Sequence, residues 1–254
     1  MWKTTLAGFL IAVVAILTAQ WLEGTPLRLL LQPTAAAIVF GATLGAVVVQ
    51  SNAQDLLGAI RLLKWLLQPE PEQSQALKHV HEWAKLAHRD GFLKLDGMAA
   101  QIANPWLRKG LEMVADNFEA ERIRQALQRD LHEHEVRVRR AIKVWEAAAG
   151  YAPTIGIIGS VLGLMHIMTG FEDTGAIGQG LASAFVATFY GLALANLVCL
   201  PLANKFKTLL AMQVQGSLVY VDGLGFIAEK RHPRQILAAL ESTAHHKNLQ
   251  GVGA

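Results

Sequence analysis

Three hydroxyl side chains could do chemistry, because they lie in long apolar stretches of the 254-residue chain: Thr154, Ser160 and Thr188. A hydroxyl oxygen suits a hard cation, although a hydroxyl in an apolar helix is often bonded to its own backbone. Ion transfer through a membrane normally also needs a carboxylate. The stretches around these hydroxyls contain no Asp or Glu. Any acid that binds an ion there must therefore come from a partner.

Other reactive constellations are missing from the sequence. His79 with His81, and His132 with His134, are spaced i, i+2, which points the two rings to different sides of a helix and excludes a shared zinc ion. The single cysteine, Cys199, can form no internal disulfide. No glycine-rich phosphate loop follows a strand pattern. We expect no enzyme activity, no metal site and no cofactor.

Four stretches without Asp, Glu, Lys or Arg position the hydroxyls: residues 4–22, 33–49, 147–171 and 181–203. About 20 apolar residues in a helix cross a hydrocarbon core, and only helices or closed barrels satisfy their backbone there. Hydrophobic residues make up 52% of the chain, and the mean hydropathy is +0.30. The sequence therefore predicts an all-α polytopic membrane protein with four transmembrane helices and a helical cytoplasmic domain.

The positive charges orient these helices. Of 23 Lys and Arg, fifteen lie between the second and third stretches and six follow the fourth. Under the positive-inside rule, both termini and the long segment are cytoplasmic. This distribution accounts for the pI of about 9.1 without nucleic-acid binding. The predicted organisation is a first transmembrane hairpin (1–50), a cytoplasmic helical domain (51–146), a second, ion-channel-lining hairpin (147–204) and a cytoplasmic C-terminal helix and tail (205–254).

Small residues recur at helical spacing in three of the stretches, and such stripes let membrane helices pack closely. They are Gly156, Gly159 and Gly163 in the third stretch, Ala184 and Gly191 in the fourth, and Gly41 and Gly45 in the second. For Gly41 and Gly45, packing within one monomer is the favoured interpretation.

The remaining segments show helical periodicity. Residues 120–149 contain neither Pro nor Gly, which predicts one long helix rising toward the third stretch. Residues 204–229 are also expected to be helical, and we expect a disordered tail over residues 245–254.

Three segments carry a specific pattern: APTIGIIGSVLGL at 152–164, AFVATFYG at 184–191 and NLVCLPLANK at 196–205. They resemble the MotA/PomA branch of the MotA/TolQ/ExbB family, and LQPT at 31–34 with FGATLG at 40–45 fits it as well. The resemblance implies a subunit of an ion-driven flagellar motor stator in the bacterial inner membrane. Such subunits form a pentamer around a MotB- or PomB-like partner, whose aspartate carries the ion, and turn the rotor protein FliG.

The resemblance also assigns roles to residues. Pro153 and Pro201 match prolines that couple ion passage to movement, and a proline inside a helix does open its hydrogen-bond ladder; simple helix punctuation is the alternative. Ser160 leaves the ion undecided by itself, and the proton is expected rather than the sodium ion. The residues expected to line the ion pathway are Thr154, Ser160, Thr188 and Tyr190.

The rotor contact fits the family pattern less closely. Gly97 and Ala100 stand where the family has an arginine and a glutamate. Nearby charges could serve instead: Arg89, Asp90, Lys94, Asp96, Arg108, Lys109 and Glu112. Two other functions stay open. One is a TolQ/ExbB-like energiser of a periplasmic partner, whose relatives typically have three spans; the other is a passive membrane scaffold or channel.

Overall fold

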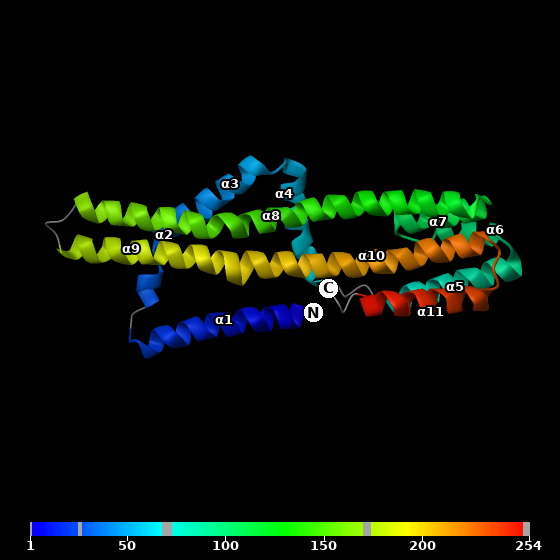
Figure 1. Ribbon diagram of the computed structural model, residues 1–254, viewed down its shortest axis with the longest axis horizontal. Coiled ribbons are helices and arrows are strands. Elements are labelled where there is room, and N and C mark those ends of the chain that lie inside the picture. Colours follow the sequence, from blue (N-terminus) through cyan, green and yellow to red (C-terminus); the bar gives the residue numbers. More distant parts are fainter. Residues whose placement is uncertain (1, 25–26, 68–72, 170–173, 251–254) are drawn as a thin grey trace. The chain divides into compact units, whose positions relative to one another are not determined.

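The computed structural model describes residues 2–24, 27–67, 73–169 and 174–250 (Figure 1). Every regular element within these residues is a helix, which confirms the predicted all-α class. The chain forms two compact units. Unit 1 consists of Met1–Pro69 and Arg137–Thr208, and unit 2 of Glu70–Val136 and Leu209–Ala254.

Unit 1 contains the apolar helices and two π-helical turns, η2 and η4. Pro33 starts α2 at the first helical position, where its missing N–H costs nothing. η2 continues α2 into α3, and η4 continues α9 into α10. The elements that lie wholly in unit 1 are α1 (Trp2–Leu22), η1 (Leu27–Leu30), α2 (Pro33–Ala36), η2 (Ala37–Gly41), α3 (Ala42–Gln50), α4 (Ala53–Leu62), η3 (Leu63–Leu67), α9 (Thr174–Ala193) and η4 (Leu194–Cys199).

Unit 2 contains four shorter helices: α5 (Gln73–Asp90), α6 (Leu93–Ala99), α7 (Pro105–Ala115) and α11 (Pro233–Gln250). Gly91 separates α5 from α6 with φ of 84°, a conformation that favours glycine. Asn104 caps α7 by accepting a hydrogen bond of 3.0 Å from the backbone N–H of Trp106. α11 contradicts the disorder expected for residues 245–250, which continue this helix, while residues 251–254 of the expected tail lie outside the described residues.

Two long helices belong to both units. α8 (Ala120–Thr169) has 50 residues, about 75 Å at 1.5 Å per residue. The predicted long helix from Ala120 is confirmed, and it continues without interruption through the third apolar stretch. α10 (Leu200–Ala228) likewise prolongs the fourth stretch, as expected.

The core of unit 2 joins its short helices to the two long ones. Leu95, Leu111, Ile123, Leu127 and Leu224 are all fully buried in it. A methyl group on Gly110 would lie 2.7 Å from a methyl carbon of Leu224, so α7 packs closely only because this residue lacks a side chain.

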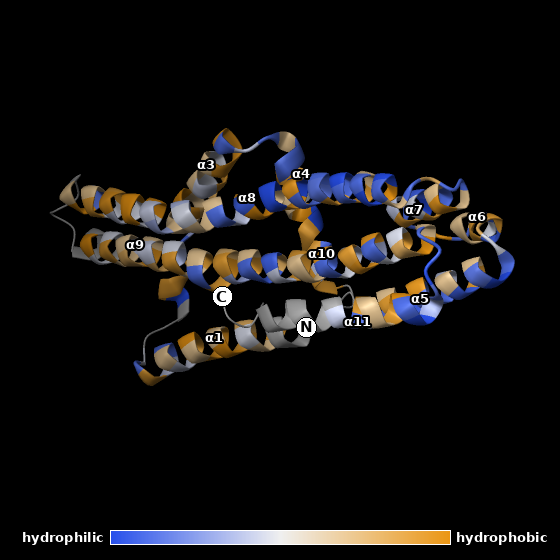
Figure 2. Ribbon diagram, turned by 45° about the vertical axis from the view of Figure 1, so that its right-hand side comes forward, coloured by the Kyte–Doolittle hydropathy of each residue, from blue (hydrophilic) through white to orange (hydrophobic). Residues whose placement is uncertain are grey.

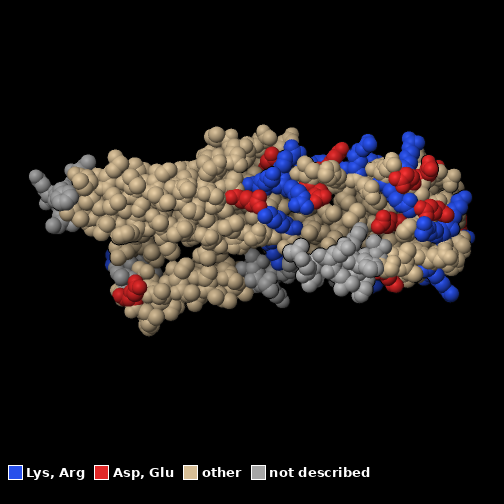
Figure 3. Space-filling view, in the orientation of Figure 1, with Lys and Arg blue, Asp and Glu red and all other residues tan. Residues whose placement is uncertain are grey.

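Among the described residues, three helical stretches are long and apolar enough to cross a membrane. They occur within Arg28–Gln50, Ala120–Met168 and Gly180–Ala228, and the apolar stretch Leu6–Leu22 of α1 is shorter. Figure 2 shows that α8 is hydrophilic in its first part and hydrophobic in its last part. On the face drawn in Figure 3, a long part of the surface likewise shows no Lys, Arg, Asp or Glu side chains. An apolar, charge-free exterior of this size is typical of a membrane protein.

Candidate functional site

The last part of α8 and α9 touch through their small residues. A methyl group on Gly156 would lie 3.0 Å from the carbonyl oxygen of Ala187 and 3.3 Å from the Cα atom of Gly191. A methyl group on Gly163 would lie 3.0 Å from the Cα atom of Ala184. The two backbones are therefore in direct contact along about two turns.

Gly159 and Gly191 belong to the same interface. A methyl group on Gly159 would lie 2.8 Å from the Cβ atom of Ala187, and one on Gly191 would meet the carbonyl oxygen of Ala152. Gly41 and Gly45 differ, because a Cβ atom at either position would meet no atom within 4 Å apart from its chain neighbours and its own helix backbone. Within the described part of the chain, no other helix approaches these two glycines closely, and their packing within one monomer stays a prediction.

The three hydroxyls lie in different surroundings. The Ser160 hydroxyl is half-buried and donates a 2.9 Å hydrogen bond across the interface to the carbonyl oxygen of Ala184. The Thr154 hydroxyl is exposed and donates to the carbonyl oxygen of Tyr151 at 2.8 Å, on its own helix. Thr188 is half-buried, beside Gly156. Ser160 and Thr188 therefore both lie at the interface between α8 and α9, whereas Thr154 lies on the exposed face of α8.

Tyr190 has a separate set of neighbours. Its hydroxyl donates to the carbonyl oxygen of Leu30 and accepts a 3.4 Å hydrogen bond from the backbone N–H of Gln32. Its ring lies 6.0 Å from that of Phe40, centroid to centroid. Tyr190 thus binds the segment that precedes α2, at Leu30 and Gln32, to α9. The spacing of residues in the sequence could not indicate this contact.

Each of the two prolines lies within a long helix and removes one backbone hydrogen bond from it. Pro153 lacks an N–H, so the Ala149 carbonyl loses its helical donor, and Pro201 has the same effect on Leu197. Just before Pro201, η4 adopts π-helical pairing, with the N–H of Leu200 bonded to the carbonyl of Ala195. The helix segments before Pro153 and before Pro201 pack together in one buried cluster. It is made by Ala149, Ala152, Ala195 and Cys199, with Trp145, Ala148 and Leu194 beside it.

The charged residues expected at the rotor contact lie in unit 2, on α5, α6 and α7. Arg89 and Asp90 pair with each other at 2.8 Å, and the Arg89 guanidinium holds the pKa of Asp90 below its ordinary value. Lys109 pairs with Asp130 at 2.6 Å, and Arg108 donates to the carbonyl oxygen of Ile102 at 2.8 Å. The other three residues of this set are exposed: Lys94, Asp96 and Glu112.

Two family models match this chain. Residues 6–89 match the N-terminal region of motility protein A, and residues 98–216 match the MotA/TolQ/ExbB proton channel family. The chain belongs to the MotA/TolQ/ExbB proton channel family. Membership of a channel family confirms that the chain is not an enzyme, and the match over residues 6–89 favours the motility branch over TolQ and ExbB.

Relatives in this family align over nearly the whole chain. Motility protein A of Bacillus subtilis is 29% identical over 92% of this chain and 87% of its own length. Chemotaxis protein PomA of Vibrio alginolyticus is 27% identical, over 94% and 93%. A chain of the flagellar MotAB stator complex from Bacillus subtilis superposes with a TM-score of 0.86 at 28% identity, covering 99% of this chain and 100% of that one. The C. jejuni MotAB structure shares the fold, with a TM-score of 0.88 at 24% identity over 94% of each chain.

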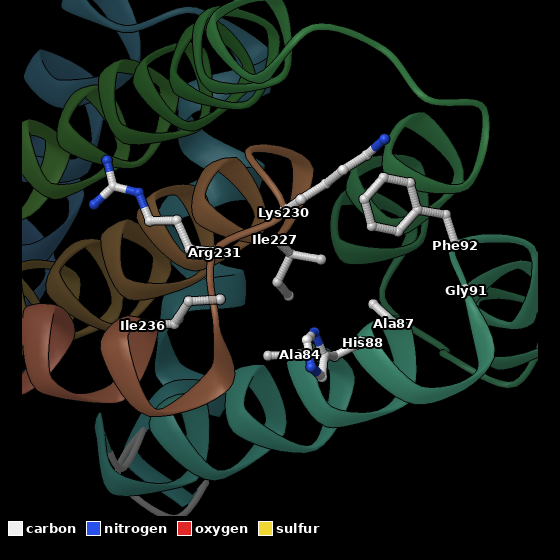
Figure 4. Close-up of a pocket in the computed structure, with 9 residues that line it drawn as sticks. All are labelled: Ala84, Ala87, His88, Gly91, Phe92, Ile227, Lys230, Arg231 and Ile236. Carbon is white, nitrogen blue, oxygen red and sulfur yellow. The ribbon is translucent and has the colours of Figure 1, made fainter.

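Sequence reasoning missed a pocket of about 330 Å³, whose lining includes His88 and Gly91, the residues that flank Arg89 and Asp90 in the sequence (Figure 4). His88, Gly91 and Phe92 line it from α5 and the turn after α5, and Lys230 and Arg231 come from the turn between α10 and α11. The Lys230 ammonium lies 5.7 Å from the centre of the Phe92 ring. The pocket thus adds basic groups to the surface on which this chain has fewer charges than the family pattern, and these groups come from about 140 residues further along the chain.

An ion-pair network fixes this turn. Glu229 accepts from Arg124 at 2.5 Å and from Arg231 at 2.6 Å. Partial burial alone would raise the pKa of Glu229, but the two guanidinium groups outweigh it and hold the pKa below its ordinary value. Glu229 therefore ties α8 to the turn that forms one wall of the pocket.

Proposed function

We propose that this chain is the ring subunit of an ion-driven flagellar motor stator. The observation that carries the proposal is an α8–α9 interface with hydroxyls at Ser160 and Thr188 but no carboxylate in either apolar stretch, in a member of a proton channel family. A group that binds and releases an ion in a membrane is usually an acid. The ion pathway is therefore completed by the aspartate of a MotB-like single-span partner.

The number and orientation of the membrane spans are inferred from helix length and from the distribution of Lys and Arg. Four helices span the inner membrane, because α1 has 21 residues, about 32 Å, which matches a hydrocarbon core of about 30 Å. The distribution of Lys and Arg supports cytoplasmic termini and a cytoplasmic unit 2. Five copies surround the partner, embedded in bilayer lipid, and unit 2 meets the rotor protein FliG. Residues 1–50 form the first transmembrane hairpin and residues 51–146 the cytoplasmic helical domain. Residues 147–204 form the second, ion-channel-lining hairpin, and residues 205–254 the cytoplasmic C-terminal helix and tail.

The interrupted helices give a route from ion passage to movement. The ladders of α8 and of the α9–η4–α10 helix are both open beside the Ala149–Cys199 cluster, so bending is easiest there. Both helices continue into unit 2. A small change at the ion pathway is thereby passed along stiff helices to the charged surface, with Pro153 and Pro201 as the coupling residues.

Swimming tests the proposal directly. A strain that lacks this gene should build flagella but not rotate them with this stator, and the gene supplied from a plasmid should restore rotation. Collapse of the proton gradient, but not of the sodium gradient, should stop the complemented strain. Loss of energy-dependent uptake across the outer membrane, with swimming unchanged, would instead favour a TolQ/ExbB-like energiser.

Purified vesicles test the need for a partner. The chain alone should carry no ion current, and the chain assembled with a single-span partner that contains an intramembrane Asp should carry one. Sustained current from the chain alone would refute the assignment, because no acid in its apolar stretches could then account for it.

A further inference from the structure

α1 is separated from the α9–η4–α10 helix by an apolar groove. Its larger cavity is about 590 Å³ and is lined from α1 by Leu6, Phe9 and Ala12 and from the other wall by Val198, Pro201 and Lys205. A second cavity of about 260 Å³ continues it and shares Phe9 and Val198 with the first. The groove therefore runs along one face of α1 inside unit 1.

One end of the groove is charged. Lys205 carries the only charge among the described residues that line the two cavities, and it makes no ion pair with any described residue. Lys207, two residues further, is instead paired with Glu146. An ammonium at the end of an apolar groove, at the edge of a membrane span, matches the phosphate of a lipid headgroup.

The length of the groove also fits a lipid. Along the helix wall it extends from Phe189 to Lys205, 16 residues or about 24 Å. One leaflet of the hydrocarbon core is about 15 Å thick. The groove is thus longer than one leaflet is thick, so an acyl chain whose headgroup lies at Lys205 can stay in the groove from the headgroup to the middle of the membrane.

We propose that this groove binds one anionic phospholipid of the cytoplasmic leaflet, with its phosphate on Lys205 and an acyl chain between α1 and the helix that contains Pro201. A second copy of this chain is a poorer occupant, because its apolar stretches contain no acid that could pair with Lys205. The lipid contacts Val198 in the π-helical turn and Pro201 after it. The inference rests on the membrane orientation proposed above. It places the lipid beside Pro201, where the helix lacks a backbone hydrogen bond and where we propose that ion passage is coupled to movement.

Retention of lipid by the purified full-length protein tests this inference. The protein is placed in bilayer discs of equal phosphatidylglycerol and phosphatidylcholine, extracted into detergent, and its retained lipid is measured by mass spectrometry. Lys205→Ala should lower the retained phosphatidylglycerol about fivefold, the order expected for one Lys near an anionic headgroup. Lys207→Ala, the matched control on the same helix, should retain as much as the wild type.

Ala12→Phe provides an independent arm, because it fills the groove without changing charge. It should reduce both lipids. The inference is overturned if Lys205→Ala and Lys207→Ala retain equal amounts, or if Ala12→Phe retains as much as the wild type, since the lipid would then be bound elsewhere or the groove occupied by a second copy. Swimming is not the readout, so this failure would leave the stator assignment standing.

Discussion

Replacing Gly191 with alanine tests whether the α8–α9 contact is as close as the structure has it. The new methyl group would meet the carbonyl oxygen of Ala152 and lie 3.1 Å from the Cα atom of Gly156. Both are backbone atoms, which cannot rotate away, so the helices must separate by a few tenths of an ångström or more. Overpacking of this kind costs about 1–3 kcal/mol. The better helix propensity of alanine returns about 0.8–1 kcal/mol. Because contacts with backbone atoms favour the upper end of the overpacking cost, the net loss is about 2 kcal/mol.

Gly41→Ala is the matched control, because it makes the same chemical change in a membrane helix where the new methyl group would meet no atom within 4 Å apart from its chain neighbours and its own helix backbone. Thermal unfolding of the two purified variants in one detergent, at one scan rate, should place Gly191→Ala about 4 °C or more below the wild type. Gly41→Ala should unfold at or above the wild-type temperature. If Gly191→Ala unfolds together with Gly41→Ala, the close backbone contact inferred for α8 and α9 is wrong.

Three further predictions concern other parts of the chain. Thr188→Val and Pro153→Leu should each abolish swimming while membrane insertion, measured by fractionation, stays normal; swimming at wild-type speed would contradict the assigned roles. Glu229→Gln should lower the free energy of unfolding by about 1 kcal/mol at neutral pH, a value discounted for solvent screening. Because the folded pKa of Glu229 is lowered, its ion pairs stabilise the protein above pH of about 4.5 and are lost as the pH falls further, so acid unfolding followed by fluorescence should depend less on pH in the variant. Arg89→Glu and Lys94→Glu should each reduce torque only slightly in tethered cells, since charges are spread over the surface, and loss of torque from either one alone would refute this.

The elements that follow from local sequence were predictable. Four runs without charges located α1, the α2–α3 region, the end of α8 and α9, because burial of a charge in a membrane is costly. The absence of Pro and Gly in residues 120–149 predicted the first part of α8, which the structure continues to Thr169. The helical spacing of Gly156 and Gly163 located the face of α8 that contacts α9.

Contacts between residues far apart in the chain were not predictable. Tyr190 bonds to Leu30 across 160 residues, and no local pattern indicates that pairing. Glu229 was the end of an expected helix, but its partner Arg124 is 105 residues away. The boundary between the two units falls inside α8 and α10, where the sequence remains helical on both sides. A division along the chain therefore cannot reproduce units assembled from separate segments.

The cluster of Ala149, Ala152, Ala195 and Cys199 explains why both prolines can be tolerated in long helices. An open carbonyl in a helix is costly when it is buried without a donor, and small side chains let the adjacent backbone adjust, as the π-helical turn of η4 does. Bulky residues at these four positions would instead fix the two helices in one arrangement. The coupling proposed for Pro153 and Pro201 requires that the helices can bend at this cluster while α8 and α10 beyond it stay stiff. The combination of two prolines with small neighbours, on helices that continue for several turns, meets both requirements in one chain.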